Sequence, residues 1–217
     1  MIRLPEEQSL EKICHILGAG PLYGYIPDVR EEDLLVAADG GVRYCREFGL
    51  VPDHIIGDFD SLGFVPKDDN VTVLPVIKDD TDTLSCLEYG LEKGYRTFLI
   101  YGGTGGRIDH TVANLQHLAF LAEKGARGYL LSERNIITLI KDAVISFRED
   151  AKGFLSVFSF GDRACGVTIR GMKYQVEDIL LTNTYPLGVS NEFTGNRAEV
   201  SVKEGKLLLV YERDASE

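Results

Sequence analysis

The sequence lacks the residues and segments that several classes of protein require. Its 217 residues include four cysteines, which lie far apart and form no C-x-x-C pair, and four histidines without close metal-ligand spacing. This argues against a zinc site and against a disulfide framework. No apolar run approaches the roughly 20 residues of a membrane span, and the opening segment is acidic where a signal peptide would be basic. We therefore expect a cytoplasmic protein that does not bind membranes.

Basic residues are also in short supply. The chain has 23 Lys and Arg residues against 34 Asp and Glu residues, which leaves a net charge of -11. Binding to nucleic acid depends on a basic surface that neutralises phosphates, so this charge argues against a nucleic-acid partner. It leaves open a small phosphorylated ligand, because a divalent cation and a few local donors can hold one on an acidic protein.

The apolar pattern of the chain changes once. Up to about residue 130, short apolar runs alternate with helical stretches near 41–48, 82–93 and 110–123, which predicts an α/β domain with a parallel sheet. Later apolar runs are short and broken by Gly, Asp and Asn, and K-E-G-K at 203–206 suggests a hairpin turn. We therefore predict an α/β domain over residues 1–135 and an all-β domain over residues 136–217.

Acidic residues follow the predicted strands of the first domain. They are Asp39, Asp58 and Asp60, the K-D-D-T-D cluster at 78–82, and Asp109 beside Arg107. Ligands of α/β sheets bind beyond the carboxyl ends of the strands. Two carboxylates one residue apart repel each other unless a cation lies between them. An isolated D-x-D also occurs in polar turns, but acidic residues at four strand ends favour a functional cleft.

A glycine-rich segment, YGGTGGRIDHTVANL at 101–115, leads into the third predicted helix. Four glycines in five positions expose backbone N–H groups at a helix start, which suits a phosphate. The segment lacks the Lys-Ser/Thr ending of a P-loop, so an ordinary turn is the alternative. We interpret a second glycine segment, GAGPLYG at 18–24, as a strand-to-loop turn.

Helical periodicity separates two faces of the helix that follows. One face carries Val112, Leu115, Ala119 and Ala122, and the opposite face carries His110, Asn114 and His117. We expect His110 and Asn114 to point into the cleft. For His117, a polar stripe that faces solvent is an equal alternative.

Five motifs in order resemble those of the thiamine pyrophosphokinase family. They are A-A-D-G-G at 37–41, G-D-F-D-S at 57–61, K-D-D-T-D at 78–82, G-G-T-G-G-R-I-D-H at 102–110 and V-S-N-E-F at 189–193. The resemblance covers nearly the whole chain after the first ten residues. It implies an α/β catalytic domain followed by a β-sandwich domain, and a homodimer. It also implies transfer of the diphosphate of ATP to the hydroxyethyl group of thiamine, with release of AMP.

The same resemblance assigns roles to residues. It implies that Mg²⁺ is bound by Asp58, Asp60 and Asp82, which together with Arg107 form the catalytic set. It implies ATP contacts for Asp39, Lys78, Asp79, Thr104, Asp109 and His110, and thiamine contacts for Ser190 and Asn191. Thiamine would lie between two subunits. Some relatives place a tryptophan over the thiamine ring, and this chain contains no tryptophan.

The residue types suit this chemistry, although other interpretations share parts of the pattern. Transfer of a diphosphate needs charge neutralisation and alignment more than covalent catalysis, and carboxylates are hard oxygen ligands for magnesium. The segment HIIGDFDSL at 54–62 also resembles the start of haloacid-dehalogenase-type phosphatases, which have Thr or Val where Leu62 stands. The remaining alternatives are a pyrophosphokinase for another hydroxymethyl substrate, such as a pterin, and a catalytically silent ligand sensor.

Overall fold

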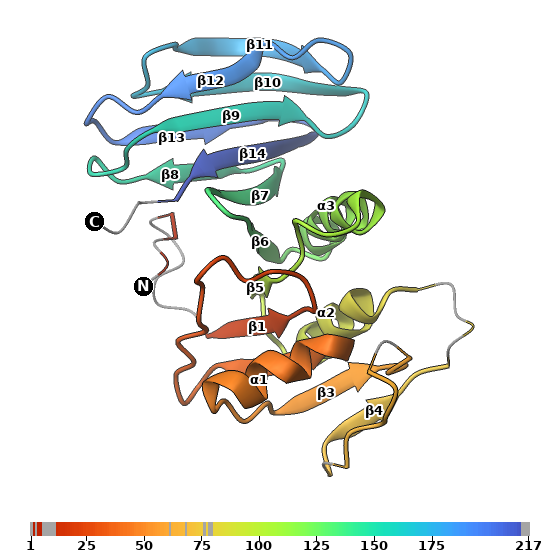
Figure 1. Ribbon diagram of the computed structural model, residues 1–217. Coiled ribbons are helices and arrows are strands. Elements are labelled where there is room, and N and C mark those ends of the chain that lie inside the picture. Colours follow the sequence, from red (N-terminus) through yellow and green to blue (C-terminus); the bar gives the residue numbers. More distant parts are fainter. Residues whose placement is uncertain are drawn as a thin grey trace. The chain divides into compact units, whose positions relative to one another are not determined.

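The computed structural model describes residues 2, 4, 5, 12–60, 62–67, 69–75, 77 and 80–213 (Figure 1). The chain divides into two compact units. The α/β unit comprises Lys12–His117 and Gly128–Glu133, and the β unit comprises Met1–Glu11, Leu118–Arg127 and Arg134–Glu217. Among the described residues, no helix has both the length and the apolar character needed to cross a membrane.

The α/β unit is built on strands that correspond to the short apolar runs of the sequence. They are β1 (Ile13–Leu17), β2 (Leu34–Ala38), β3 (His54–Gly57), β4 (Val71–Val73), β5 (Thr97–Tyr101) and, from Gly128 on, β6 (Arg127–Leu131). Strands β2 and β5 are buried along their whole length, as expected for parallel strands covered on both faces. The pairs β1–β2, β1–β5, β2–β3 and β3–β4 are parallel, so the predicted α/β architecture is confirmed.

The strand order of this unit reverses direction next to β1. The order is β6-β5-β1-β2-β3-β4. The chain thus moves outward from β1 to β4, returns to the other side of β1 with β5, and continues to β6. In open α/β sheets, ligands bind beyond the carboxyl ends of the strands at such a reversal. The expected binding region therefore lies where β1 and β5 end.

The described part of the chain has three α-helices, close to the three that the sequence predicts. They are α1 (Val42–Phe48), α2 (Asp82–Glu92) and α3 (Ile108–Glu123). Helix α2 packs on β1, β2 and β3 (Figure 1). A Cβ atom at Gly90 of α2 would lie 2.6 Å from the ring of Phe98 on β5, so this close approach depends on glycine. Helix α3 belongs to the α/β unit up to His117.

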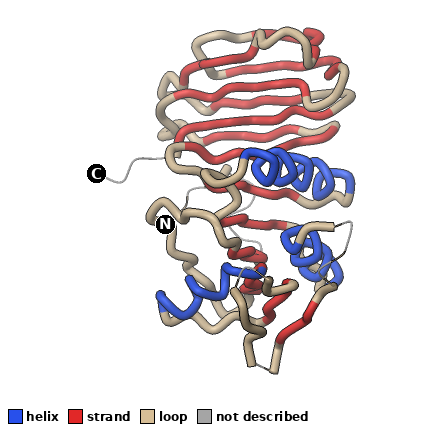
Figure 2. Tube along the Cα trace, turned by 45° about the vertical axis from the view of Figure 1, so that its right-hand side comes forward, coloured by secondary structure: helices blue, strands red, loops and turns tan. Residues whose placement is uncertain are grey.

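The β unit is built mainly of strands, which are red in Figure 2. They form two antiparallel sheets, with the orders β12-β9-β14-β7 and β11-β10-β13-β8. Their strands are β7 (Asn135–Lys141), β8 (Val144–Phe147), β9 (Phe154–Ser159), β10 (Arg163–Arg170), β11 (Val176–Thr182), β12 (Gly188–Glu192), β13 (Ala198–Ser201) and β14 (Lys206–Glu212). The ring centroids of Phe147 on β8 and Tyr211 on β14 are 5.2 Å apart. Aromatic side chains of the two sheets therefore meet in one core, which confirms the predicted β-sandwich.

The prediction of a hairpin at 203–206 is wrong. Strand β13 before this segment and strand β14 after it belong to different sheets. Glu204 forms a bridge with Cys165, and the Gly205 backbone N–H donates to Asp142 Oδ1 at 2.7 Å. The segment therefore carries the chain from one sheet to the other. Local turn residues predict a reversal of the chain, but the choice of sheet depends on distant partners.

Candidate active site

The carboxyl ends of four neighbouring strands define the candidate site. The parallel register pairs Leu17 of β1 with Tyr101 of β5 and with Ala37 of β2, and it pairs Ala38 with Ile56 of β3. The loops after these strands therefore leave the sheet at the same edge. They contain the predicted site residues Asp39, Asp58, Asp60, Thr104 and Arg107.

Two glycine segments pack against each other at this edge. The Gly18 N–H donates to the Tyr101 carbonyl oxygen at 2.9 Å, and the Gly20 N–H donates to the Gly102 carbonyl oxygen at 3.0 Å. Gly102 has a φ of 63°, and a Cβ atom there would lie 2.7 Å from the carbonyl oxygens of Gly18 and Gly20. The segment 18–24 is therefore a packing partner of the glycine-rich loop, and not only a turn.

Two further glycines bring the acidic loops close to their neighbours. A Cβ atom at Gly41 would lie 1.8 Å from the Leu17 carbonyl oxygen, and one at Gly57 would lie 2.8 Å from the Asp39 Cα. Any larger residue would push these backbones apart. Asp39 therefore lies against the residue that precedes Asp58, so the structure brings these two predicted residues to neighbouring positions.

Asp58 and Asp60 flank a buried residue in a strained conformation. Phe59 is 2% exposed and has a φ of 60°, which is rare for a bulky side chain. Asp58 is half-buried, Asp60 is exposed, and the Asp60 N–H donates to Asp58 Oδ1 at 3.2 Å. Because backbone strain clusters at functional sites, this turn supports a role for the two carboxylates.

Asp82 is the first residue of α2. Thr81 caps the helix, because its Oγ1 accepts a hydrogen bond from the Leu84 N–H at 3.2 Å. The half-buried Asp82 therefore sits in a first turn whose orientation depends on the cap. The predicted residues Lys78 and Asp79 lie outside the described residues.

The donors at this edge fit a magnesium ion. In the described ranges, no group of three or more His, Cys, Asp or Glu side chains could hold a metal ion. Mg²⁺ is usually bound through one or two carboxylates together with water and substrate phosphates. Asp58 and Asp60 supply two carboxylates at the end of β3. Two carboxylates are enough for a magnesium site that water and substrate phosphates complete.

Arg107 and Asp109 form an exposed ion pair beside the glycine-rich loop. Arg107 Nη2 lies 2.5 Å from Asp109 Oδ2, and its Nε lies 3.2 Å from Oδ1. The Arg107 side chain is 73% exposed. Hydrogen bonding from Arg107 lowers the pKa of Asp109. The guanidinium is thus at the surface and already faces one anionic partner, so a phosphate would compete with that carboxylate or share the guanidinium with it.

The other two predicted ATP residues of this loop differ in exposure. Thr104 is buried, and its hydroxyl donates to the Leu131 carbonyl oxygen at 3.4 Å. His110 is exposed, and its backbone N–H donates to Asp109 Oδ1 at 3.1 Å. Thr104 therefore ties the loop to the end of β6, whereas the His110 side chain is open to solvent. Contacts of either residue with ATP stay a prediction.

Helix α3 buries a different face from the expected one. Val112, assigned to the apolar face, is 50% exposed, whereas Asn114 and His117 are 6% and 7% exposed. Burial lowers the pKa of His117. The solvent-facing alternative for His117 is therefore wrong, because hydrogen bonds satisfy both polar side chains inside the unit.

Ser190 and Asn191 lie on β12, at an irregularity in its pairing with β9. Ser190 is exposed with a φ of 58°, and its N–H donates to Ser156 Oγ at 3.0 Å. Asn191 is buried. Its Oδ1 accepts from the N–H groups of Tyr174 and Glu192, and its Nδ2 donates to the Tyr174 carbonyl oxygen at 2.7 Å. The Asn191 amide thus clamps the backbone of Tyr174.

The sequence analysis did not identify two tyrosines beside predicted site residues. Tyr174 is 61% exposed and is held by Asn191. Tyr23 has a φ of 55°, and a Cβ atom at Gly105 would lie 1.6 Å from its hydroxyl oxygen. Their positions depend on contacts between segments far apart in the chain, so no local pattern indicates them.

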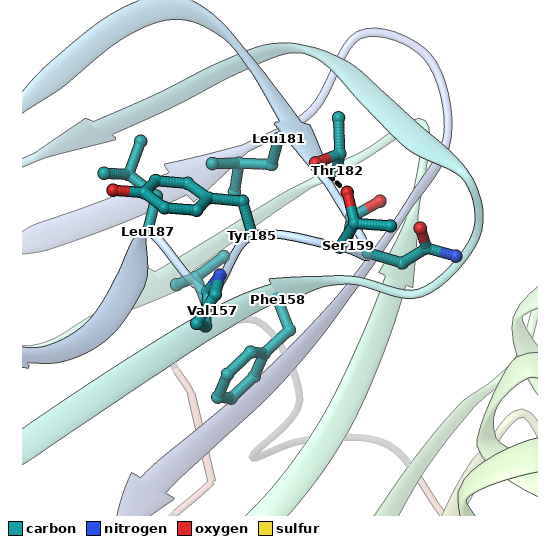
Figure 3. Close-up of a pocket in the computed structure, with 10 residues that line it drawn as sticks. Val157, Phe158, Ser159, Leu181, Thr182, Tyr185 and Leu187 are labelled. Carbon is teal, nitrogen blue, oxygen red and sulfur yellow. Dashed lines mark hydrogen bonds between the residues drawn. The ribbon is translucent and has the colours of Figure 1, made fainter.

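A pocket of about 230 Å³ lies in the β unit (Figure 3). Its lining comes from the end of β9 and from the segment 181–187, including the labelled side chains of Val157, Leu181 and Tyr185. Thr182 Oγ1 lies 3.3 Å from Thr184 Oγ1 within this lining. None of the predicted site residues lines the pocket, so the candidate site rests on the strand ends and not on this cavity.

Comparisons with known proteins identify the family. The model of the thiamin pyrophosphokinase catalytic domain matches residues 28–130, and the model of the thiamin pyrophosphokinase vitamin B1 binding domain matches residues 142–207. The chain is 28% identical to the thiamine pyrophosphokinase of Bacillus subtilis over 214 residues, which cover 94% of this chain and all of the relative.

Solved structures agree with this match. The crystal structure of the Bacillus subtilis enzyme has a TM-score of 0.82 at 27% identity and covers 94% of this chain and 100% of its own. The thiamin pyrophosphokinase of Geobacillus thermodenitrificans has a TM-score of 0.80 at 27% identity and covers 94% of this chain and 99% of its own. Both domain models, the relative and the two structures agree with the motifs and fold described above: the chain belongs to the thiamine pyrophosphokinase family and is an enzyme, a thiamine diphosphokinase.

Proposed function

We propose that this chain transfers the diphosphate of ATP to the hydroxyethyl oxygen of thiamine, which gives thiamine diphosphate and AMP. The observation that carries the proposal is the meeting of acidic loops and glycine loops at the reversal of the parallel sheet. Asp58 and Asp60 follow β3, and the glycine segments follow β1 and β5. Carboxylates beside a glycine-rich loop at such an edge suit a magnesium–polyphosphate complex.

Asp58 and Asp60 would hold the metal, and Asp82 would approach it only when the magnesium–ATP complex is bound, because no three such side chains are grouped to hold a metal ion in the described ranges. When bound, Mg²⁺ neutralises charge on the phosphate oxygens and orients them. The protein residues align the reactants: the thiamine oxygen forms a bond to the β-phosphorus while the bond from that phosphorus to the α–β bridging oxygen breaks. Such transfers rest on positioning and electrostatics. Arg107 supplies a planar guanidinium for the transferring group, and Lys78 supplies a point charge.

The nucleotide would lie along the loops after β2, β3 and β5. We assign ATP contacts to Asp39, Lys78, Asp79, Thr104, Asp109 and His110. The strongest support is at Asp109, which holds the exposed Arg107 guanidinium beside the glycine-rich loop. Backbone N–H groups of glycine-rich turns bind anions readily.

Thiamine would be bound by the β unit around Ser190 and Asn191. The exposed Ser190 offers a hydroxyl group, whereas Asn191 acts mainly through its clamp on Tyr174, because backbone groups occupy its oxygen. We propose Tyr174 as the aromatic side chain that packs on the thiamine ring, since it is exposed and its backbone is fixed. Such stacking suits a cationic ring.

We further propose a homodimer in which two subunits share the thiamine site. Exposed apolar side chains on the β unit support it, namely Leu180, Tyr185, Leu187 and Val189, because exposed apolar clusters mark interaction surfaces. The proposal includes a catalytic domain over 1–135, a thiamine-binding domain over 136–217, and a cytoplasmic location. The four cysteines are free, as in a reducing compartment.

Incubation of the protein with ATP, Mg²⁺ and thiamine is expected to yield AMP and thiamine diphosphate in equal amounts. Phosphorus NMR identifies both products in one spectrum. Formation of ADP, or of inorganic phosphate without dependence on thiamine, would contradict the proposal. A phosphoaspartate trapped on Asp58 would instead favour the phosphatase alternative, and turnover of a pterin in place of thiamine would favour the related pyrophosphokinase.

Loss of the Ser190 hydroxyl is expected to weaken the binding of thiamine and not the binding of ATP. Ser190→Ala should raise the Michaelis constant for thiamine roughly 5- to 100-fold and leave that for ATP nearly unchanged, because an unpaired polar partner costs about 1 to 3 kcal/mol. Steady-state kinetics, with thiamine and ATP varied in turn, measure the two Michaelis constants.

Ser190→Gly is the matched control for this prediction. It removes the same hydroxyl but tolerates the φ of 58° better than alanine does. Equal effects of the two variants support a lost contact, and divergent effects indicate backbone strain instead.

For a thiamine site shared by two subunits, mixing Asp58→Ala and Ser190→Ala subunits should restore one intact site per heterodimer. Activity that only averages the two parents, after proven subunit exchange, would contradict the shared site.

A further inference from the structure

A chain of hydrogen bonds inside the α/β unit joins the glycine-rich loop to the start of α2. The Asn114 Nδ2 donates to the Gly103 carbonyl oxygen at 2.8 Å, and Asn114 Oδ1 lies 3.1 Å from His117 Nδ1. His117 Nε2 lies 3.2 Å from Thr81 Oγ1. Both α3 side chains are more than nine-tenths buried. The three bonds therefore run through the interior from one loop of the site to the other.

With a neutral imidazole ring, the donors and acceptors allow one direction along this chain. Asn114 uses its NH₂ group on Gly103, so its oxygen accepts from His117, and His117 Nδ1 must carry a proton. Thr81 Oγ1 accepts the Leu84 N–H, and its own hydroxyl proton is free to be donated to His117 Nε2. A neutral ring with the proton on Nδ1 satisfies every bond. The lowered pKa of His117 agrees with a neutral ring.

Each end of this chain of hydrogen bonds lies in an element of the candidate site. Gly103 belongs to the glycine-rich loop, and a Cβ atom there would lie 2.9 Å from Asn114 Nδ2, so the amide and the loop are in tight contact. Thr81 is the cap of α2 and directly precedes Asp82. A shift of the His117 ring would therefore move both the loop backbone and the first turn that carries a proposed magnesium ligand.

We propose that His117 is a positioning residue that sets the spacing between the glycine-rich loop and Asp82 through Asn114 and Thr81. The inference rests on the proposed function, because it assumes that magnesium and the phosphates of ATP bind between these two elements. In this proposal, His117 itself contacts neither the magnesium ion nor the phosphates. Residues that orient a ligand through a hydrogen bond typically change metal affinity or activity by about 10- to 100-fold when they are replaced.

The ring tautomer tests the chain of bonds without any assay of activity. Nitrogen-15 NMR of the wild-type protein should show His117 with a protonated Nδ1 and an unprotonated Nε2 at neutral pH. The opposite tautomer would overturn the proposal, because His117 Nδ1 could then not donate to Asn114 Oδ1. A charged ring would also overturn it, because His117 Nε2 would then donate to Thr81 Oγ1 instead of accepting from it.

Kinetics test the positioning role. His117→Phe keeps a planar ring but removes both bonds, and it should lower kcat/KM for magnesium–ATP about 10- to 100-fold while the Michaelis constant for thiamine changes less than about 2-fold. His117→Gln, with an amide that can accept from Thr81 and donate to Asn114, should recover most of the loss. Rescue by an amide distinguishes hydrogen bonding from packing.

His54 provides a matched control in the same unit. Its Nε2 lies 2.8 Å from Thr72 Oγ1, and its ring stacks on Tyr89 at 4.5 Å between centroids. It is the first residue of β3, at the end of the strand opposite Asp58. His54→Phe therefore removes a similar histidine–threonine bond away from the site, and it should leave kcat/KM for magnesium–ATP unchanged.

The outcomes separate this inference from the proposed function. A wild-type protein that makes no thiamine diphosphate refutes the function and leaves the tautomer result valid. If the wild type is active but His117→Phe behaves like His54→Phe, or loses thiamine and ATP efficiency equally in proportion to its thermal stability, the positioning role is wrong. If His117→Phe does not fold, Thr81→Ser and Thr81→Ala replace it: serine keeps the bond to His117, and equal loss in both variants overturns the proposal.

Discussion

Replacement of Asp58 by asparagine is expected to lower the turnover number by about 10³-fold or more, because charge stabilisation contributes factors of this order to phosphoryl transfer. The fold should survive. Asparagine retains the oxygen that accepts the Asp60 N–H at 3.2 Å, and loss of one of two crowded carboxylates relieves repulsion in the metal-free protein. Turnover at saturating magnesium measures the effect, and thermal unfolding verifies the fold. Asp60→Asn should behave similarly.

Asp80 is the matched control for this experiment. It is exposed, lies two residues before Asp82, and has no role in the proposed site. Asp80→Asn changes the net charge by the same amount as Asp58→Asn, so it should keep near wild-type turnover. If Asp58→Asn also keeps near wild-type turnover at saturating magnesium, Asp58 is not a metal ligand.

Replacement of Gly102 by alanine is expected to destabilise the protein by about 2 to 6 kcal/mol. Its φ of 63° and the 2.7 Å separations between a built Cβ atom and the carbonyl oxygens of Gly18 and Gly20 act together. Backbone strain and overpacking each cost about 1 to 3 kcal/mol. Activity should fall as well, because the two glycine segments move apart. Denaturant unfolding measures the free energy of unfolding.

Gly106 serves as the control in the same loop. A Cβ atom there meets nothing within 4 Å, and its φ does not lie in the left-handed region. Gly106→Ala should therefore leave the free energy of unfolding unchanged or raise it by up to about 1 kcal/mol. Similar losses in the two variants would show that the contact between the glycine segments is not what makes Gly102→Ala destabilising.

Local pattern accounts for much of the fold. The alternation of apolar runs with helical stretches predicts the parallel α/β sheet, and the shorter apolar runs that follow predict an all-β domain, because side-chain periodicity follows directly from strand and helix geometry. Asp39, Asp58 and Asp60 were assigned to strand ends for the same reason. Their roles in binding stay a prediction.

Features that depend on contacts between distant segments were missed or wrong. The expected hairpin at 203–206 joins two sheets, and the segment 18–24 packs on Gly102. The hydrogen bonds of Asn191 with the Tyr174 backbone were also missed, and its contact with thiamine stays a prediction. In each case a single segment is compatible with several partners, and the choice depends on which partner the fold brings near.

Helix α3 separates the two kinds of information most clearly. The sequence by itself determined that a helix begins after the glycine-rich loop, and its period determined that Asn114 and His117 share a face. The tertiary structure alone decided that this polar face is buried, because Gly103 and Thr81 offer hydrogen-bond partners that satisfy it inside the unit. Burial of a polar group is stable only when such partners are present, and those partners come from positions 11 and 36 residues away in the chain.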